Sequence, residues 1–351
     1  MACPDLQSRC ATSLVPYRDF DYPRLVSTPG KGNWISGTEY FFVEEIPLYP
    51  FAGEGEHSAL VVRKRDISTR DLALKVAAAL NLEPSAVGYG GMKDKDATAV
   101  QAFTLYRADE QKAAAAFLEA GAEILSVSRH ANKLRLGHLA GNRFKVFIAG
   151  GDIEMARNSL TALFDCGVPN FFGPQRFGVE GKNIEDGLRV LKGFGKFGRW
   201  KRDLLVSSVQ SLLFNEILAR RMEEGVLGAA LPGDVMQKTD SGGLFVCEDP
   251  EVDSRRLTMK AVVPTGPIFG RKMKQPAGAP AQAEKQVLAD FGLPEDLFRR
   301  ENGTRRALAF HLEDPKVEEG EGGIWLHFVC PPGCYATSVI REVAESGVLR
   351  K

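Results

Sequence analysis

The segment Val87–Ala97 constrains this chain more than any other feature. One short apolar run, Ala86–Tyr89, overlaps its start and a second, Val100–Tyr106, follows its end, and both have the length of strands. Between them the segment carries glycines and then four consecutive charged residues, Lys93, Asp94, Lys95 and Asp96. Glycine and aspartate are common in turns. The sequence therefore predicts two strands joined by a charged, glycine-rich loop.

Asp94 is the candidate for chemistry in this loop. The lysines on either side stabilise an ionised carboxylate, which can act as a nucleophile or as a general base. An ordinary turn would use the same residue types. Two phosphate-binding motifs are excluded, because the third glycine of G-x-G-x-x-G counted from Gly88 falls on Lys93 and no G-x-x-x-x-G-K-[ST] occurs.

The rest of the chain mixes predicted strands and helices without a strict β–α–β alternation. Strands are predicted at 41–49, 59–64, 86–89, 100–106, 123–130, 133–139, 144–149, 307–312 and 324–329. Helices are predicted at 68–80, 109–120, 152–164, 207–224, 283–291 and 337–345, and a proline-rich loop at 265–281. This pattern favours an α+β fold with largely antiparallel strands. The length of 351 residues predicts two domains, and residues 1–35, rich in Pro, Ser and Gly, are expected to be poorly ordered.

Charge is distributed unevenly along the chain. The 45 basic and 45 acidic residues cancel, which argues mildly against a nucleic-acid partner. However, no acid occurs in 124–151, 187–202 or 254–283, although each holds at least five lysines and arginines. Such runs predict a basic face for nucleic acid, and each is equally compatible with an ordinary solvated surface.

The cysteines and the apolar runs bound the environment. The six cysteines form no C-x-x-C pair, and no metal-ligand spacing occurs, so reduced thiols and no metal are expected. No run of 18 apolar residues is present and the first residues do not form a signal peptide. The predicted location is the cytoplasm, without a membrane partner.

Further motifs occur in a fixed order around the Asp94 loop. They are Gly53-Glu54-Gly55-Glu56-His57, Val61-Val62-Arg63-Lys64-Arg65, Lys133-Leu134-Arg135-Leu136-Gly137, Gly141-Asn142-Arg143-Phe144, Asn170-Phe171-Phe172-Gly173-Pro174-Gln175-Arg176-Phe177-Gly178 and Gly333-Cys334-Tyr335-Ala336-Thr337. Together with the loop they resemble the TruD family of pseudouridine synthases over residues 39–343.

The resemblance implies a fold and an activity. The fold is a pseudouridine synthase catalytic domain with a mixed, largely antiparallel sheet, at 1–167 plus 305–351, interrupted by an inserted α/β TRUD domain at 168–304. The activity is isomerisation of a uridine of tRNA, at position 13 in the D arm of bacterial substrates, with base flipping and without a cofactor or metal. A monomer is expected. The alternative is an RNA-binding or RNA-folding protein of the same fold without turnover.

The resemblance also assigns roles to residues. Asp94 matches the catalytic aspartate, and Lys93 matches a lysine beside it that keeps the aspartate ionised or contacts a phosphate. Asn142 and Phe144 match the family's G-N-x-F block, where the asparagine orients the aspartate or the base and the phenylalanine stacks on the uracil. The order of bond events and the role of Asp94 as nucleophile or base stay open.

Two further residues complete the predicted site, and one residue of the family pattern is missing. Tyr335 falls where relatives carry an aromatic residue in G-x-[FY]-A-T, and Arg176 is assigned to substrate positioning at the domain junction. A lysine that many relatives carry before an E-D-F segment falls on Ile35 here, so one basic contact of the family is absent from that position.

Overall fold

The computed structural model describes residues 21–345, which form two compact units. Residues 26–168 with 311–345 are here named the sheet unit, and residues 21–25 with 169–310 the helical unit. The chain returns to the sheet unit at 311, later than the expected 305, because β12 (Thr304–Ala307) pairs with β11 (Val262–Ile268) inside the helical unit. The assignment of the two units as catalytic and inserted domains stays a prediction.

The sheet unit is built on nine strands. The order along the main path is β14-β15-β7-β2-β5-β3-β6, with β1 on β7 and β4 on β5. Only β2 and β5 are parallel neighbours, and every other pair in this sheet is antiparallel. The strands are β1 (Asn33–Trp34), β2 (Phe41–Pro47), β3 (His57–Lys64), β4 (Val87–Tyr89), β5 (Thr98–Tyr106), β6 (Glu123–His130), β7 (Leu139–Ala149), β14 (Glu313–Gly320) and β15 (Gly323–Cys330).

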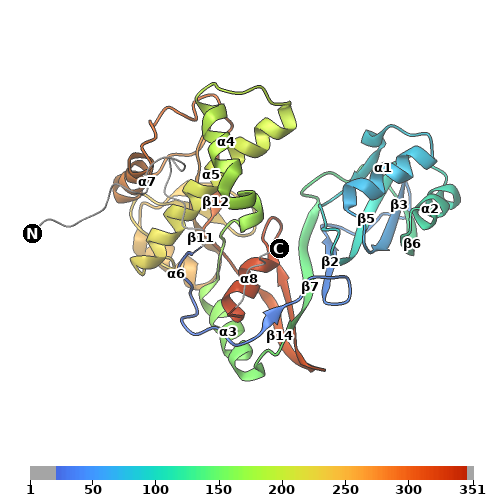
Figure 1. The fold of residues 1–351 in the computed structure, drawn as a ribbon, viewed down its shortest axis with the longest axis horizontal. Coiled ribbons are helices and arrows are strands. Elements are labelled where there is room, and N and C mark those ends of the chain that lie inside the picture. Colours follow the sequence, from blue (N-terminus) through green and yellow to red (C-terminus); the bar gives the residue numbers. More distant parts are fainter. Residues whose placement is uncertain (1–20, 346–351) are drawn as a thin grey trace, which may run out of the picture. The chain divides into compact units, whose positions relative to one another are not determined.

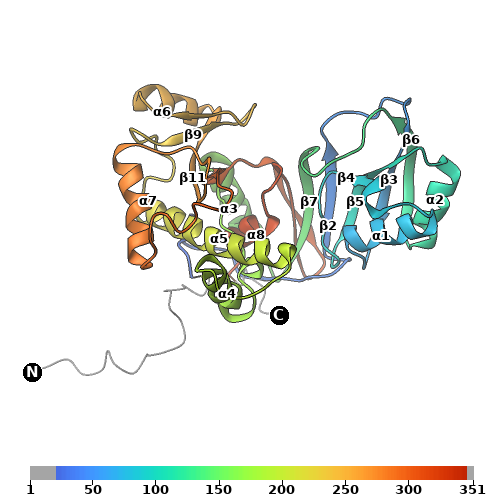
Figure 2. The same ribbon diagram turned by 90° about the horizontal axis from the view of Figure 1, so that it is seen from above.

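Helices cover this sheet at both ends (Figure 1; Figure 2). At one end α1 (Thr69–Ala79) and α2 (Glu110–Glu119) pack on β3 and β5, burying Leu60, Val62, Phe103 and Phe117 with the apolar side of both helices. At the other end α3 (Ile153–Cys166) packs against β14 and α8 (Ala336–Val343). Burial of such side chains stabilises the unit by roughly 1.5–3 kcal/mol each.

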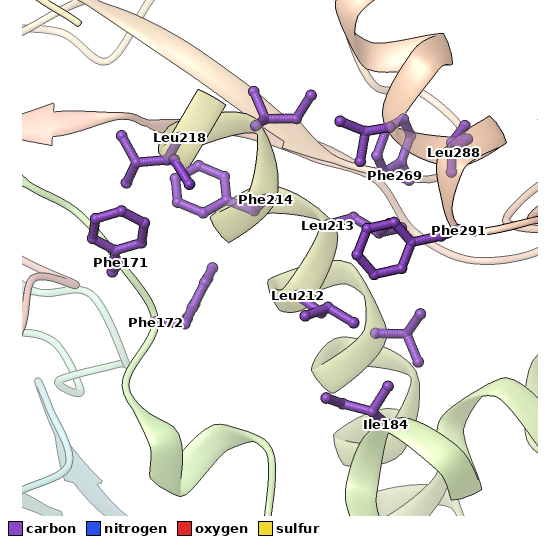
Figure 3. Close-up of a cluster of buried hydrophobic side chains, with 14 of the residues drawn as sticks. Phe171, Phe172, Ile184, Leu212, Leu213, Phe214, Leu218, Phe269, Leu288 and Phe291 are labelled. Carbon is purple, nitrogen blue, oxygen red and sulfur yellow. The ribbon is translucent and has the colours of Figure 1, made fainter. Parts of the chain in front are cut away.

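The helical unit holds a four-stranded sheet of order β10-β9-β11-β12 and a long central helix. That helix, α5 (Arg199–Glu223), carries Phe214 and Leu212 into a core with Phe172, Ile184 and Leu288 (Figure 3). The other elements of this unit are β9 (Val235–Lys238), β10 (Leu244–Val246), α4 (Lys182–Leu191), α6 (Pro250–Thr258) and α7 (Gly278–Asp290), with the short turns η2 (Pro174–Arg176) and η3 (Val179–Gly181). Strand β8 (Val168–Pro169), at the boundary between the two units, pairs with β13 (Ala309–Phe310). The turn η1 (Pro84–Ala86) lies in the sheet unit.

The mixed, largely antiparallel α+β fold is as predicted, and three local predictions are wrong. Residues 133–138 do not form a strand, and β7 begins only at Leu139. Leu134 N donates to the side-chain hydroxyl of Thr104 on β5 rather than to the backbone of a neighbouring strand. The loop expected at 265–281 instead overlaps the end of β11 (Val262–Ile268) and the start of α7, which begins at Gly278. Within the expected disordered segment, residues 1–20 lie outside the described part, whereas Tyr22 is 3% exposed and stacks on Phe171.

Candidate active site

The Asp94 loop connects β4 to β5, as the sequence predicts, and its aspartate is exposed. The glycines before it are required by close packing. A Cβ on Gly90 would lie 2.9 Å from the His138 carbonyl oxygen and 3.0 Å from Glu45 Oε1. A side chain there would push the loop away from β2 and β7, so the glycine sets where Asp94 lies.

Lys93 turns into the protein and pairs with Glu45. Its Nζ lies 2.8 Å from Glu45 Oε2, and the two side chains are only 5% and 3% exposed. Burial raises the pKa of Glu45, and the Lys93 ammonium opposes that rise. The ammonium is therefore committed to a buried carboxylate in this structure, and the expected contact of Lys93 with substrate stays a prediction.

Lys64 forms hydrogen bonds to the backbone of the Asp94 loop and was not among the predicted site residues. This side chain is fully buried, at the end of β3. Its Nζ donates to the backbone carbonyl oxygens of Ile67 at 2.7 Å, Asp94 at 2.8 Å and Lys93 at 3.3 Å. Burial lowers the pKa of Lys64 to about 8, and the nearby charge of Asp94 counteracts this. The burial of Lys64 could have been predicted from the sequence, because side chains alternate along a strand and Lys64 lies on the same face of β3 as Leu60 and Val62.

Two more buried side chains fix the loop backbone. The Thr69 hydroxyl accepts a hydrogen bond from Lys93 N at 2.8 Å and donates to Gln101 Oε1 at 2.7 Å. Gln101 Nε2 in turn donates to the Gly91 carbonyl oxygen at 3.4 Å. With Lys64, these contacts hold the chain from Gly91 to Asp94 against the start of α1 and the centre of β5. A carboxylate on so constrained a backbone is held in a small range of positions, which favours catalysis.

Asn142 is brought beside the Glu45–Lys93 pair by strand register. On β7 it lies opposite Glu45 of β2 and Cys330 of β15, so the three side chains share one face of the sheet. Asn142 is 9% exposed, and its buried Oδ1 has no hydrogen-bond partner among the described residues. Buried polar atoms are usually paired. An unpaired amide oxygen here is suited to a ligand.

Phe144 lies two residues further along β7 on the same face. Its ring centroid is 5.9 Å from that of Phe41 and 5.5 Å from that of Phe328, and the residue is 7% exposed. The ring is therefore packed into an aromatic row across β2, β7 and β15. The stacking of this ring on a uracil stays a prediction.

The remaining predicted residues lie elsewhere in the fold. Tyr335 is 39% exposed and immediately precedes α8 in the sheet unit. Arg176 belongs to the helical unit, where its guanidinium carbon lies 5.4 Å from the centroid of the Phe172 ring. Ile35, at the position of the absent family lysine, is half-buried and follows β1.

Membrane spans and metal clusters are both absent from residues 21–345. None of the helices in that range is both long and apolar enough to cross a membrane. That range also contains no group of three or more His, Cys, Asp or Glu side chains placed to hold a metal ion.

Cys330, opposite Asn142 on β15, is fully buried, and burial raises the pKa of its thiol well above the usual value. Cys330 is therefore a packed core residue beside the candidate site.

The fold has a counterpart among solved structures, which defines its class. A crystal structure from Methanosarcina mazei, described as a putative tRNA pseudouridine synthase D, superposes with a TM-score of 0.68 over 94% of this chain and 96% of that one, at 21% identity. The two chains therefore share the same overall fold.

Sequence comparisons identify the family. The family model described as tRNA pseudouridine synthase D (TruD) matches residues 24–196 and 191–343. Proteins named tRNA pseudouridine synthase D from an Anaeromyxobacter species and from Thermus thermophilus are 41% and 40% identical, over 91% and 94% of this chain and 94% of each relative. The chain belongs to the TruD family. The predicted family and the predicted class of enzyme, an isomerase, are confirmed.

Proposed function

We propose that this protein converts uridine 13 in the D arm of tRNA to pseudouridine, with Asp94 as the catalytic residue. The observation that carries this proposal is the Asp94 loop itself. Its carboxylate is exposed, while the backbone around it is held by the buried side chains of Lys64, Thr69 and Gln101. A fixed backbone with a free carboxylate suits a residue that attacks or deprotonates a bound nucleotide.

The reaction needs an anionic group and a pocket rather than an external reagent. The N1–C1′ bond breaks and a C5–C1′ bond forms; N1 gains a hydrogen and C5 loses one, so substrate and product are isomers. Asp94 supplies the anionic group, as a nucleophile at C1′ or C6 or as the base that removes a sugar proton. Attack at C1′ or C6 forms a covalent bond between Asp94 and the nucleotide, whereas removal of a sugar proton forms none. All three routes place the carboxylate against the ribose or base.

Asn142 and Phe144 are assigned to the uracil. The unpaired Asn142 Oδ1 is a hydrogen-bond acceptor suited to the imide N–H of the base. The Phe144 ring stacks on the flipped base, a contact worth roughly 1–3 kcal/mol. Such contacts offset the few kcal/mol that extrusion of a base requires.

The proposal is tested with tRNA labelled with tritium at uracil C5, without added cofactor. Wild type is expected to release tritium, and Asp94→Ala to release none while retaining tRNA binding. Asp96→Asn, on the same loop, is the matched control and is expected to keep most activity. Mapping of the product to position 13 checks the site. Absence of release by wild type with intact tRNA binding would favour an RNA-binding protein without turnover.

A further inference from the structure

A basic surface lies on the helical unit, far along the chain from the Asp94 loop. It consists of residues 192–202, which run from the end of α4 into the first turn of α5, together with 294–301, and is here named the α4–α5 surface. Figure 1 shows the connection between these two helices. The two segments line a pocket of about 610 Å³. A pocket of this size accepts a nucleotide-sized group.

The charges that line this pocket are unbalanced. Five side chains are basic, Lys192, Lys196, Arg202, Arg299 and Arg300, and two are acidic, Asp296 and Glu301. Both acids are already engaged, Glu301 with Arg202 at 3.0 Å and Asp296 with Arg299 at 3.2 Å.

Three cations remain. Lys192, Lys196 and Arg300 are exposed, and no carboxylate of a described residue pairs with them. Like charges gathered without counter-charges repel one another, so this arrangement is complementary to a polyanion.

Exposed aromatic residues alternate with cations along the segment 192–202. Trp200 is 71% exposed and Phe194 is 63% exposed, and Lys201 Nζ lies 5.0 Å from the centroid of the Phe197 ring. Aromatic rings interleaved with lysines and arginines are the composition of surfaces that stack bases and track a phosphate backbone.

We propose that the α4–α5 surface binds a single-stranded or loop segment of the RNA substrate. Lys192, Lys196 and Arg300 contact backbone phosphates at the pocket, and Trp200 stacks on an unpaired base. The identity of the RNA as tRNA rests on the proposed function. The surface provides affinity and takes no part in the chemistry at Asp94.

The test measures binding of unmodified tRNA to the full chain as a function of salt. The variant Lys192→Ala/Lys196→Ala/Arg300→Ala removes the three cations. Its charge-matched control, Lys75→Ala/Lys112→Ala/Lys238→Ala, removes three exposed lysines outside this surface. The first variant is expected to raise the Kd at least about tenfold and to lower the slope of log K against log salt by about 2, at roughly 0.7 per lost contact. The control is expected to change neither.

The aromatic contribution is tested separately. Trp200→Ala is expected to raise the Kd about 5- to 100-fold with little change in salt slope, because stacking is not ionic. Trp200→Phe is expected to recover most of the affinity. An unchanged Kd and salt slope for the triple variant, with equal behaviour of its control, would overturn the proposal.

Binding and turnover separate the two proposals. If wild type binds tRNA through this surface but releases no tritium, the proposed function fails and the surface stands. If wild type turns over while the triple variant keeps its Kd and KM, the surface fails and the proposed function stands. If the surface is correct, the triple variant changes KM and leaves kcat within about twofold.

Discussion

The ammonium of Lys64 lies 2.8 Å from the backbone carbonyl oxygen of Asp94, so a fully buried cation holds the residue proposed to carry the chemistry. The bond is to the main chain, which leaves the Asp94 carboxylate exposed. Lys64 is therefore a positioning residue rather than a catalytic one.

Replacing Lys64 by an uncharged side chain of similar length is expected to separate the positioning of Asp94 from the binding of tRNA. Lys64→Met removes the donor from the carbonyl oxygens of Ile67 and Asp94, and loss of a partner for a buried polar group costs about 1–3 kcal/mol. We expect kcat to fall about 10- to 100-fold with little change in KM for tRNA. The control is Lys75→Met on the exposed side of α1. Unaltered kcat would mean that Thr69 and Gln101 suffice to hold the loop.

The lowered pKa of Lys64 predicts a pH dependence of stability. In the folded protein, burial lowers the pKa of Lys64 from 10.5 to about 8. The charge of Asp94 opposes this shift, and the charge of Lys93 adds to it. Between pH 8 and 10.5 the unfolded chain binds more protons at this position than the folded chain does. Stability from this group therefore rises with pH in that window, by at most about 1.4 kcal/mol per pH unit. Below about pH 8 the penalty for burying the charge is constant.

Urea unfolding of wild type and Lys64→Met at a series of pH values from about 7 to about 10 measures this effect. Subtraction of the two curves removes the titration of groups that both proteins share. Wild type is expected to gain stability relative to the variant as pH rises above about 8. A difference that is flat over this range would show that Lys64 titrates at its ordinary pKa.

The Glu45–Lys93 pair predicts strong coupling between two buried charges. Glu45→Gln leaves the Lys93 ammonium, 5% exposed, without its counter-charge, and breaking a buried pair from one side typically costs about 3–5 kcal/mol. The double variant Glu45→Gln/Lys93→Met removes both charges and is expected to regain more than half of that loss. A double-mutant cycle from urea unfolding measures the coupling. Additive losses would mean that the two charges are solvated independently.

Local features of this site were predictable from sequence, and its long-range contacts were not. The β4–loop–β5 hairpin follows from adjacent apolar runs and glycines, and the Ser68 cap of α1 follows from a polar residue before a periodic helix. The contact of Lys64 with Asp94 depends on β3 pairing with β5 so that Lys64 lies opposite Ala99. The pairing of Glu45 with Lys93 depends on the one parallel contact in the sheet, β2 with β5.

The predicted strand at 133–139 is a case in which a local pattern was present but the predicted element did not form. Leu134 and Leu136 alternate with basic residues as in a half-buried strand, but Leu136 is 65% exposed and Leu134 is bound to the Thr104 side chain. A short apolar alternation specifies burial of every second residue only when a neighbouring strand edge is available, and β4 already occupies this part of the edge of β5.

Asn142 provides a test that distinguishes function from stability. Its Oδ1 is buried without a partner among residues 21–345, so Asn142→Leu removes an unsatisfied polar atom and fills similar volume. The free energy of unfolding is expected to change by less than about 1 kcal/mol or to rise, while tritium release falls at least about 100-fold if the amide contacts the uracil. Asn215 is the matched control, because it is also fully buried but its amide accepts from Phe172 N at 2.9 Å and donates to Phe172 O at 3.0 Å. Asn215→Leu is therefore expected to lose about 2–4 kcal/mol of stability. Equal destabilisation by the two variants would mean that the Asn142 oxygen is paired in solution, and the assignment of this amide to the base would then be wrong.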